Sequence, residues 1–514
     1  MIMSLKNIFF LLLFGFFASN ASGQDYPKRE MRAVWIATVE NIDWPSKKGI
    51  SAQEQQEEYV KMLDHFQSIG INAIIMQIRP TADTFYPSSF EPWSAYLTGK
   101  QGAMPNTYYN PLSFMIEQAK KRGIEFHAWF NPYRASNSKD FIPSENHPLM
   151  TNPEWFVHYG GKWYYDPGIP EAREYVFNSI IETVKHYDLD AVHFDDYFYP
   201  YKVANEVFPD SLSYKTHGAD FPIIDAWRRE NVDYFVEELG KRIKAEKPFV
   251  KFGISPFGVW RNKSQDPAGS DTQAGVTNYD DLYADVLRWL REGWIDYITP
   301  QIYWHIGFER AEYKTLVDWW SKNSFGKHLY IGQGVYRLGE KGWEDPAEVF
   351  NQISFNREFE NVQGSMYFSA KTFMNNKEGL NDKIKAVYPY KALVPTMPWI
   401  KSTPPAAPIL ENISGSQGSG ITLEWRDGLT FNNSYYVIYR SEGQEPMDLE
   451  DPKNIVAIVQ HSPYSTQSWT DHTTSRRTNY TYQISTFDRL HNESDPGNGM
   501  EIRTRGRRGS IRMR

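Results

Sequence analysis

Short apolar runs alternate with longer amphipathic stretches between Arg32 and roughly Tyr390. Eight of the runs have the length and the aromatic or β-branched content of buried strands, as in AIIMQIRP and HLYIGQGVY. Several of the stretches between them begin at Ser, Asn or Pro and end at Gly, which is typical of helices. Eight such alternations predict an α/β fold, a closed (β/α)₈ barrel. The strands are expected to begin at Arg32, Ala73, Glu125, Ala191, Lys251, Tyr297, His328 and Ser365.

An open, doubly wound sheet that binds a dinucleotide is the main alternative to a barrel for this pattern. No glycine-rich phosphate-binding sequence follows the first strand, which weakens the alternative. We therefore expect no nucleotide cofactor. One helix is expected over NYDDLYADVLRWLREG, residues 278–293.

The character of the chain changes at about Leu393. The barrel is expected to cover residues 24–392, and the Pro-rich stretch that follows predicts a semi-extended linker over 393–407. Short alternating strands over 408–502 predict a small all-β sandwich of the immunoglobulin type, and the order of TLEW, YYVIYR and YTYQISTFD resembles a fibronectin type III domain. We expect this domain to act as a spacer or docking surface. Residues 503–514 are expected to form a disordered basic tail.

The first residues predict export. Lys6 is followed by the apolar run IFFLLLFGFF and then by small residues, which is typical of a secretory signal peptide over residues 1–23 that is cleaved near Gly23. The run is too short to span a bilayer, and an uncleaved N-terminal anchor is the alternative. The chain has no Cys, so it has neither a lipid-modified Cys nor disulfides nor thiolate metal sites. We expect an exported protein, periplasmic or extracellular, without a stable membrane anchor.

Charge and aromatic content indicate the class of ligand. The net charge is −8, which argues against nucleic acid as the main ligand. Aromatic residues make up 16% of the chain, and many stand next to Pro, Asn, Gly or Asp rather than in apolar runs. Flat rings beside polar groups suit sugars, although any single ring could equally be a core residue. A polysaccharide is therefore the expected partner; the oligomeric state is left open.

The run AVHFDDYFYP ends a predicted barrel strand with two adjacent carboxylates, Asp195 and Asp196. Alternate residues of a barrel strand point at the axis, so His193 and Asp195 should share the inward face while Asp196 begins the loop. Barrel enzymes place their chemistry at the carboxyl ends of the strands. We predict that both Asp residues are catalytic; the structural alternative is that they cap the next helix or pair with Arg.

The other strand ends also carry polar and aromatic residues. Each could be structural by itself: Arg79 could neutralise Asp195, and Asn131 could cap a loop. Their presence at all eight ends favours a binding site at this face of the barrel. The predicted substrate-binding residues are Asp43, Trp44, Arg79, Asp83, Trp129, Asn131, Tyr133, Arg134, His193, Tyr197, Trp260, Gln301, Tyr303, Trp304 and Tyr336.

Glycoside hydrolysis needs one carboxyl group to protonate the leaving oxygen and a second group to stabilise or attack the developing cation. Asp195 is the first choice for the central carboxylate. Asp196 is its adjacent candidate partner, and the alternatives are Glu40, Asp43 and Asp83. In a third route the acetamido group of the substrate attacks, and a residue such as Tyr303 would hold it.

Several long motifs carry a family resemblance. QIRPTADTFYPSSFEPWSAYLTGKQG, FHAWFNPYRAS, VHFDDYFYP and GWIDYITPQIYW resemble the glycosyl-hydrolase-like ten family of bacterial envelope proteins. The resemblance implies a TIM barrel that hydrolyses glycan chains, and one member is described as acting on peptidoglycan strands stripped of their stem peptides. It also implies function at Asp195 and Asp196 and a cleft lined by Arg79, Asn131, Tyr133, Arg134, Gln301 and Tyr303. The member in question is a lipoprotein, whereas this chain has no Cys to carry a lipid.

The leading hypothesis is an exported glycosidase that cleaves a cell-wall amino-sugar glycan. A barrel that binds glycan without cutting it is one alternative, because no Glu stands out as the acid. A metal-dependent esterase or phosphodiesterase is another, with His127, His193, Asp195 and Asp196 as ligands. No H-x-H or H-E-x-x-H pair supports that second alternative, so no metal is expected.

Overall fold

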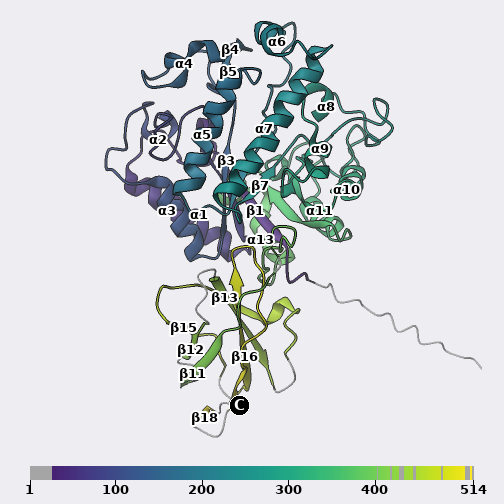
Figure 1. The fold of residues 1–514 in the computed structure, drawn as a ribbon. Coiled ribbons are helices and arrows are strands. Elements are labelled where there is room, and N and C mark those ends of the chain that lie inside the picture. Colours follow the sequence, from purple (N-terminus) through teal and green to yellow (C-terminus); the bar gives the residue numbers. More distant parts are fainter. Residues whose placement is uncertain are drawn as a thin grey trace, which may run out of the picture.

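The computed structural model describes residues 26–401, 403–416, 420–427, 433–443, 447–475, 478–503 and 510–511. The predicted signal segment, residues 1–23, lies outside these ranges. A large α/β barrel stands above a small all-β domain in Figure 1. Within the described ranges, the helices are all too short or too polar to cross a membrane.

Eight parallel strands close the barrel in the order β1-β10-β9-β8-β7-β6-β3-β2. Closure is completed where β1 pairs with β2 on one side, Ala33 beside Ala73, and with β10 on the other, Met31 beside Gly364. Each predicted run overlaps one strand, which confirms the barrel, although β1 and β10 begin before the predicted residues. The strands are β1 (Met31–Ile36), β2 (Ala73–Arg79), β3 (Glu125–Phe130), β6 (Ala191–Phe194), β7 (Lys251–Ile254), β8 (Tyr297–Ile298), β9 (His328–Gln333) and β10 (Val362–Tyr367).

Helices surround the barrel, and several begin at the predicted signals. Ser51 and Glu54 form a capping box at the start of α1, and the Asn110 side chain caps α3, which begins at Pro111. The longer helices are α1 (Ala52–Ser68), α3 (Pro111–Lys121), α5 (Pro170–His186), α7 (Ile224–Glu246), α10 (Tyr313–Lys322), α11 (Glu348–Asn356) and α13 (Leu380–Val387). The shorter ones are α2 (Ala95–Thr98), α4 (Pro148–Thr151), α6 (Ser211–His217) and α12 (Ala370–Met374).

The single helix expected over residues 278–293 is wrong. The segment forms two short helices, α8 (Asn278–Asp281) and α9 (Val286–Arg291). They are separated by Tyr283, whose φ of 54° is incompatible with a continuous helix. Arg228 donates a 2.8 Å hydrogen bond to the Tyr283 hydroxyl, so a contact with α7 holds this residue.

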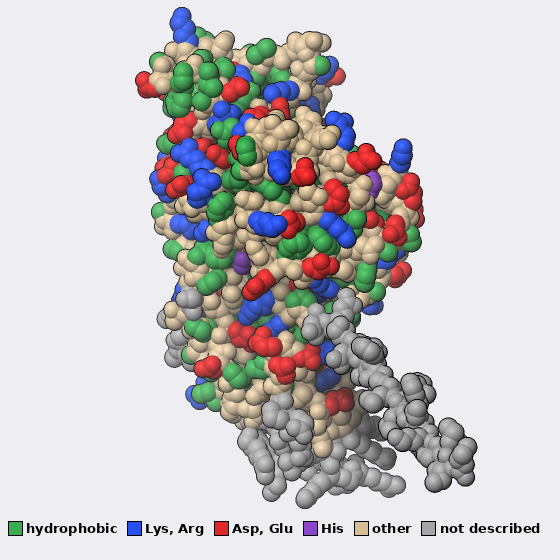
Figure 2. All heavy atoms as spheres, turned by 90° about the vertical axis from the view of Figure 1, so that its right-hand side faces the viewer, with side chains coloured by type: hydrophobic (Ala, Val, Ile, Leu, Met, Phe, Trp, Pro, Cys, Tyr) green, Lys and Arg blue, Asp and Glu red, His purple; other side chains and the backbone are tan. Residues whose placement is uncertain are grey.

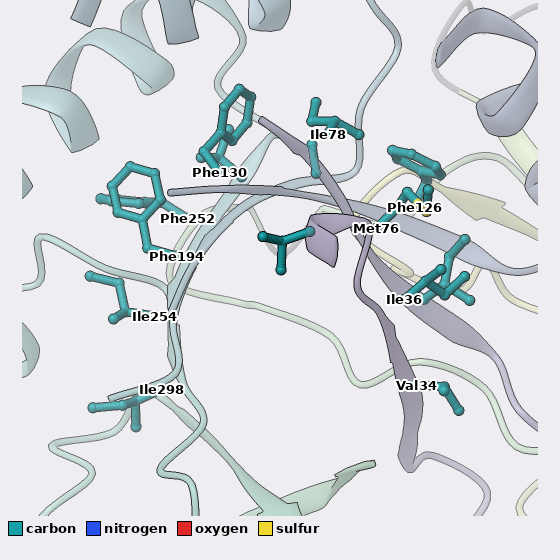
Figure 3. Packing of buried hydrophobic residues seen from close by; sticks show 14 of the residues in the cluster. Val34, Ile36, Met76, Ile78, Phe126, Phe130, Phe194, Phe252, Ile254 and Ile298 are labelled. Atoms are coloured by element: carbon teal, nitrogen blue, oxygen red, sulfur yellow. The ribbon is translucent and has the colours of Figure 1, made fainter. Parts of the chain in front are cut away.

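The barrel strands separate two apolar layers. In β1, Val34 and Ile36 belong to the large cluster that joins the strands to the helices, whereas Ala33 and Trp35 belong to a separate inner cluster. Figure 3 shows strand side chains of the large cluster. This alternation follows from the two-residue period of a strand, and it places polar residues at the inward strand ends within reach of one another.

Gly253 of β7 has no room for a side chain. An ideal Cβ atom at this position would lie 1.9 Å from Cζ of Tyr297, inside the barrel. We expect Gly253→Ala to lower the free energy of unfolding by about 1–3 kcal/mol, measured by urea denaturation, because the ring must move in a packed interior. Gly275→Ala is the control, since a Cβ there meets nothing within 4 Å. Equal midpoints for the two variants would contradict the expectation.

The C-terminal domain consists of two antiparallel sheets. One has the order β11-β12-β15 and the other β14-β13-β16-β17-β18. β11 and β17 were not predicted, and two residues of the predicted disordered tail form β18, which pairs with β17. The strands are β11 (Ile409–Ser416), β12 (Gly420–Arg426), β13 (Asn433–Glu442), β14 (Ile455–Gln460), β15 (Thr466–Asp471), β16 (Tyr480–Asp488), β17 (Met500–Arg503) and β18 (Ser510–Ile511). This confirms a small all-β domain; the fibronectin type III resemblance stays a prediction.

The C-terminal domain contacts the floor of the barrel, where the strands begin. Nε2 of His491, in the loop after β16, lies 2.5 Å from Oε1 of Glu125 and 3.2 Å from Nζ of Lys251, the first residues of β3 and β7. The predicted linker also contacts the floor, because Nε1 of Trp399 donates to Asp296 at 3.3 Å. Acidic and basic side chains are interspersed over the face of both domains seen in Figure 2.

Candidate active site

A cleft of about 460 Å³ is lined by residues from the carboxyl ends of the barrel strands and the loops that follow them. It contains both predicted catalytic residues, Asp195 and Asp196. Among the described residues, these two are the carboxylates of its lining. The lining is Trp35, Ala37, Val39, Ile42, Gln77, Trp129, Arg134, Asn137, Lys162, Tyr164, Asp195, Asp196, Tyr197, Tyr201, Ser255, Gln301, Tyr303, Tyr336 and Phe368.

Asp195 follows β6 directly and is 5% exposed. Its Oδ2 accepts hydrogen bonds from Nε1 of Trp129 at 3.2 Å and from Nδ2 of Asn131. The amide of Asn131 is held in one orientation, because its Oδ1 accepts from Gln77 at 2.6 Å and from Arg134 at 2.8 Å. The amino group of Asn131 therefore faces Asp195, and the carboxylate is fixed in the cleft.

Asp196 is held from the other side of the cleft. Its Oδ1 accepts a 3.1 Å hydrogen bond from Nε2 of Gln301, and its Oδ2 accepts from the hydroxyl of Tyr201. Nε2 of Gln301 also donates to the Ser255 carbonyl at 2.8 Å, which fixes the amide. The two adjacent carboxylates thus have separate sets of donors.

Burial keeps the carboxyl pair partly protonated near neutral pH. Burial and the negative charge of Asp196 raise the pKa of Asp195 to about 7, against the opposing effects of Arg134 and the Asn131 hydrogen bond. Burial also raises the pKa of Asp196, although hydrogen bonds from Tyr201 and Gln301 oppose the shift. Because like charges this close disfavour double ionisation, the pair titrates as a unit and retains one proton up to about pH 7.

The three alternative partner carboxylates lie outside the cleft. Asp43 accepts three 2.7 Å hydrogen bonds, from the backbone N–H groups of Ala37 and Lys371 and from the Ser369 hydroxyl, so it ties the loop after β1 to the loop after β10. Asp83 and Glu40 line a neighbouring pocket. Position therefore favours Asp196 as the partner of Asp195.

Six of the predicted substrate-binding residues line the cleft, and nine do not. Those in the lining are Trp129, Arg134, Tyr197, Gln301, Tyr303 and Tyr336. Those outside it are Asp43, Trp44, Arg79, Asp83, Asn131, Tyr133, His193, Trp260 and Trp304. Asn131 supports the cleft from behind through its bond to Asp195.

Arg79, the last residue of β2, is buried outside the lining of the cleft and does not neutralise Asp195. Its Nε donates to Glu91 at 2.7 Å, and its Nη1 donates to the carbonyls of Asn131 and Pro132. A buried guanidinium needs such a partner to offset the cost of desolvation. Arg79 thereby holds the loop after β3 that carries Asn131 and Arg134.

Four aromatic residues predicted to bind substrate pack elsewhere instead. Trp44 donates from Nε1 to the Gln55 carbonyl at 3.0 Å and is 1% exposed. Tyr133 packs on Phe235, Trp260 stacks on Trp319, and Trp304 contacts Phe257 edge to face. Trp44, Tyr133 and Trp260 are buried, which supports the core explanation for these three rings, whereas Trp304 is half-buried.

A hairpin that was not predicted from the sequence covers one side of the cleft. β4 (Phe156–Tyr159) and β5 (Lys162–Tyr165) form it, and Lys162 and Tyr164 reach the lining. The available signal was the Gly160–Gly161 pair, which takes the positive φ values of 57° and 75° that tight hairpin turns require. The other residues of the lining missed as functional candidates include Trp35, Asn137, Tyr201 and Phe368.

A column of hydrogen bonds runs along the barrel axis beneath the cleft. Glu125 contacts Nε2 of His127 at 3.0 Å, and the Tyr297 hydroxyl contacts Nδ1 of His127 at 2.8 Å and Nδ1 of His193 at 2.9 Å. Nε2 of His193 then lies 3.0 Å from the hydroxyl of Ser255, which lines the cleft. The column connects the floor contacted by the C-terminal domain with the base of the cleft.

The four residues proposed as metal ligands do not converge. His127 and His193 are part of the axial column, while Asp195 and Asp196 accept hydrogen bonds from Asn131 and Gln301. Within the part of the chain that the structure describes, no three His, Asp or Glu side chains are placed to hold a metal ion. The geometry does not favour a metal-dependent hydrolase.

Comparison with known proteins agrees with this arrangement. The glycosyl hydrolase-like 10 family matches residues 30–348, more than half of the 514 residues. The chain belongs to this family. The matched range contains seven of the eight barrel strands, all except β10. It also contains Asp195 and Asp196.

Two curated relatives of the chain are also named glycosyl hydrolases. The chain is 51% identical to the glycosyl hydrolase YngK of Bacillus subtilis, over 91% of this chain and 92% of that protein. It is 38% identical to the glycosyl hydrolase DigH of Escherichia coli K12, over 66% of this chain and 82% of that protein. The protein is a glycoside hydrolase with a carbohydrate substrate.

Among solved structures, the barrel is similar to the glycoside hydrolase domain of PgaB (BpsB) from Bordetella bronchiseptica. That likeness has a TM-score of 0.45 and 13% sequence identity, over 69% of this chain and 99% of that chain. A likeness this distant carries no information about the reaction.

Proposed function

We propose that this glycoside hydrolase is exported and cleaves the glycan strands of peptidoglycan after their stem peptides have been removed. The observation that carries the proposal is the pair Asp195 and Asp196, held by separate donors in one cleft at the carboxyl end of the barrel. The sequence of residues 1–23 supports export, and the resemblance noted above supports the polymer. We assign the C-terminal domain, as a fibronectin type III-like module, the role of closing the barrel floor.

The cleft suits an amino-sugar polymer. The rings of Trp129, Tyr197, Tyr303 and Tyr336 line it beside the carboxylates and the amide of Gln301. Rings can stack on the C–H faces of sugars while carboxylates and amides bond to their hydroxyl and acetamido groups. Tyr303 is the residue that we expect to contact an acetamido group.

The two carboxyls can divide the work of glycoside hydrolysis. One, protonated, donates its proton to the leaving oxygen, while the other, ionised, stabilises or attacks the cation that develops at the anomeric carbon. The Asn131 and Gln301 hydrogen bonds hold the two groups in place before the substrate arrives. Because the pair retains one proton near neutral pH, acid and base forms are present together.

The test uses peptidoglycan strands from which an amidase has removed the peptides, with intact peptidoglycan as the comparison. We expect the mature protein to release soluble glycan fragments from the stripped strands, followed by mass spectrometry, and to release far fewer from intact material. The masses of the fragment ends identify the bond that is cut. No release from stripped strands would reject this polymer as the substrate.

The pH dependence of the reaction follows from the raised pKa of Asp195. Above about pH 7 the carboxyl pair loses its remaining proton, and the acid form disappears. We therefore expect kcat/KM to fall about tenfold per pH unit above pH 7, as for the loss of one essential proton. A profile that stays flat from pH 7 to pH 9, measured at constant ionic strength, would contradict this expectation.

A further inference from the structure

Two cationic side chains in the cleft have no carboxylate partner. Arg134 lies in the loop after β3, and Lys162 begins β5 of the hairpin that covers the cleft. Among the described residues, no Asp or Glu oxygen lies within 4.0 Å of either charged group. The buried cations Arg79, Arg228 and Lys251, by contrast, each have a carboxylate partner.

Protein contacts hold both groups while leaving hydrogen-bond donors available. Arg134 donates from Nε to the Pro80 carbonyl at 3.0 Å and from Nη2 to Asn131 at 2.8 Å. Nζ of Lys162 donates to Oδ1 of Asn137 at 3.0 Å. A lysine ammonium has three donors and a guanidinium five, so each group can still bind a ligand.

The surroundings of Lys162 destabilise its charged form. Burial and the neighbouring charge of Arg134 lower its pKa, while Glu40 acts in the opposite direction. Glu40 reaches Lys162 indirectly, because Nδ2 of Asn137 donates to Glu40 at 3.2 Å and Oδ1 of the same amide accepts from Lys162. Two partly desolvated like charges are stabilised by an anion that binds between them.

Arg134 has a second effect that Lys162 does not share. Its charge lowers the pKa of both Asp195 and Asp196, which explains its presence in the cleft without any ligand. The groups that act on Lys162 are Arg134 and Glu40, both outside the carboxyl pair. Lys162 is therefore the residue from which the substrate can be inferred. It can be substituted without changing the charge next to Asp195.

We propose that Lys162, assisted by Arg134, binds a carboxylate substituent on a sugar next to the scissile bond. The inference rests on the proposed function and narrows its substrate class to acidic amino-sugar glycans. In peptidoglycan strands this group is the lactyl carboxylate of muramic acid. The stem peptide is attached there through an amide bond, so the charge exists only on peptide-free sugars. Lys162 thus provides a physical reason for a preference for stripped strands.

The experiment compares two forms of one substrate. Peptide-free strands are used either with free lactyl carboxylates or after carbodiimide coupling to methylamine, which converts the carboxylates to neutral amides. We expect kcat/KM of the wild type to be about ten- to a hundredfold lower on the amidated strands, the usual effect of losing a charged hydrogen bond. We expect Lys162→Gln to show a similar loss on free strands and no preference between the two forms.

Two further variants separate recognition from structure. Lys162→Arg keeps the charge and is expected to retain the preference for free carboxylates. Lys322→Gln removes an exposed lysine on α10 that pairs with Asp318, and it should behave as the wild type. Thermal unfolding of each variant confirms that it is folded.

Each possible result decides the proposal. Equal cleavage of both substrates by the wild type would overturn the carboxylate inference while leaving the proposed function intact. A Lys162→Gln variant that is slower but still prefers free carboxylates would overturn the role of Lys162. Cleavage of neither substrate by the wild type would reject the proposed function, and the inference with it.

Discussion

Asp195→Asn is expected to lower turnover by orders of magnitude while leaving the protein folded. The amide keeps the size of the carboxyl group and can still accept hydrogen bonds from Asn131 and Trp129. It can neither ionise nor transfer a proton, so kcat/KM on stripped strands should fall by about 10²- to 10⁴-fold. Initial rates of fragment release measure the effect.

Asp83→Asn is the matched control for this loss. Burial raises the pKa of Asp83 to about 6, although hydrogen bonds from Gln101 and Thr81 oppose the shift, and Asp83 lines the neighbouring pocket rather than the cleft. Its activity should stay close to that of the wild type, because Asp83 does not line the cleft. Full activity in Asp195→Asn together with loss in Asp83→Asn would reverse our assignment of the catalytic carboxyl.

The same Asp195→Asn variant should be more stable than the wild type in alkaline solution. The folded state raises the pKa of Asp195 from its usual 3.8 to about 7, so it binds this proton more tightly than the unfolded chain does. The contribution of this carboxyl to stability is therefore complete below about pH 4 and is lost as the pH rises to about 7. At pH 8 the variant should exceed the wild type by on the order of 1–3 kcal/mol in unfolding free energy.

Lys251→Met is expected to produce the largest loss of stability. Lys251 and Glu125 are 1% and 6% exposed, respectively, and form an ion pair on the barrel floor, with His491 of the C-terminal domain beside them. Burial by itself would raise the pKa of Glu125, but Lys251 and His491 hold this pKa well below its usual 4.5. Removal of the lysine leaves a buried carboxylate with too little positive charge, which costs about 3–5 kcal/mol. Urea denaturation measures the loss.

Two variants test whether burial is the cause of that loss. Lys241→Met removes an exposed lysine that pairs with Glu237, and its stability should stay close to that of the wild type, because solvent screens a surface ion pair. The double variant Glu125→Gln, Lys251→Met removes both charges and should recover part of the stability. A loss below about 1 kcal/mol for Lys251→Met alone would show that the floor pair is not needed.

The barrel could be predicted because its signal is local and repeated. A parallel strand covered on both faces is mostly apolar, and AIIMQIRP and EFHAWFNP are short, predominantly apolar runs of this kind. The same runs end at the face where the site lies, so the two carboxylates after β6 could be assigned to it. The break at Tyr283 could not be predicted in this way, since it depends on the contact with Arg228 of α7.

The residues that line the cleft were harder to predict than the position of the cleft in the fold. Asp43, Asp83 and Asp196 all follow barrel strands, and nothing in the local pattern distinguishes them. The structure distinguishes them by their partners: three donors from two loops surround Asp43, whereas Gln301 holds Asp196 in the cleft. Rings at strand ends were equally ambiguous, because Trp129 lines the cleft and Trp44 is buried in the core.

The sequence by itself determined the barrel, the small all-β domain and the strand end that carries the carboxylate pair, because each depends on residues close together in the chain. Tertiary structure alone decided which side chains share the cleft. Lys162 reaches it through a hairpin, and Tyr201 through the loop after β6. The floor cluster likewise joins His491 to Glu125, which is 366 positions away in the chain. Contacts of this kind depend on packing and charge pairing between distant segments, which the local pattern of residues does not contain.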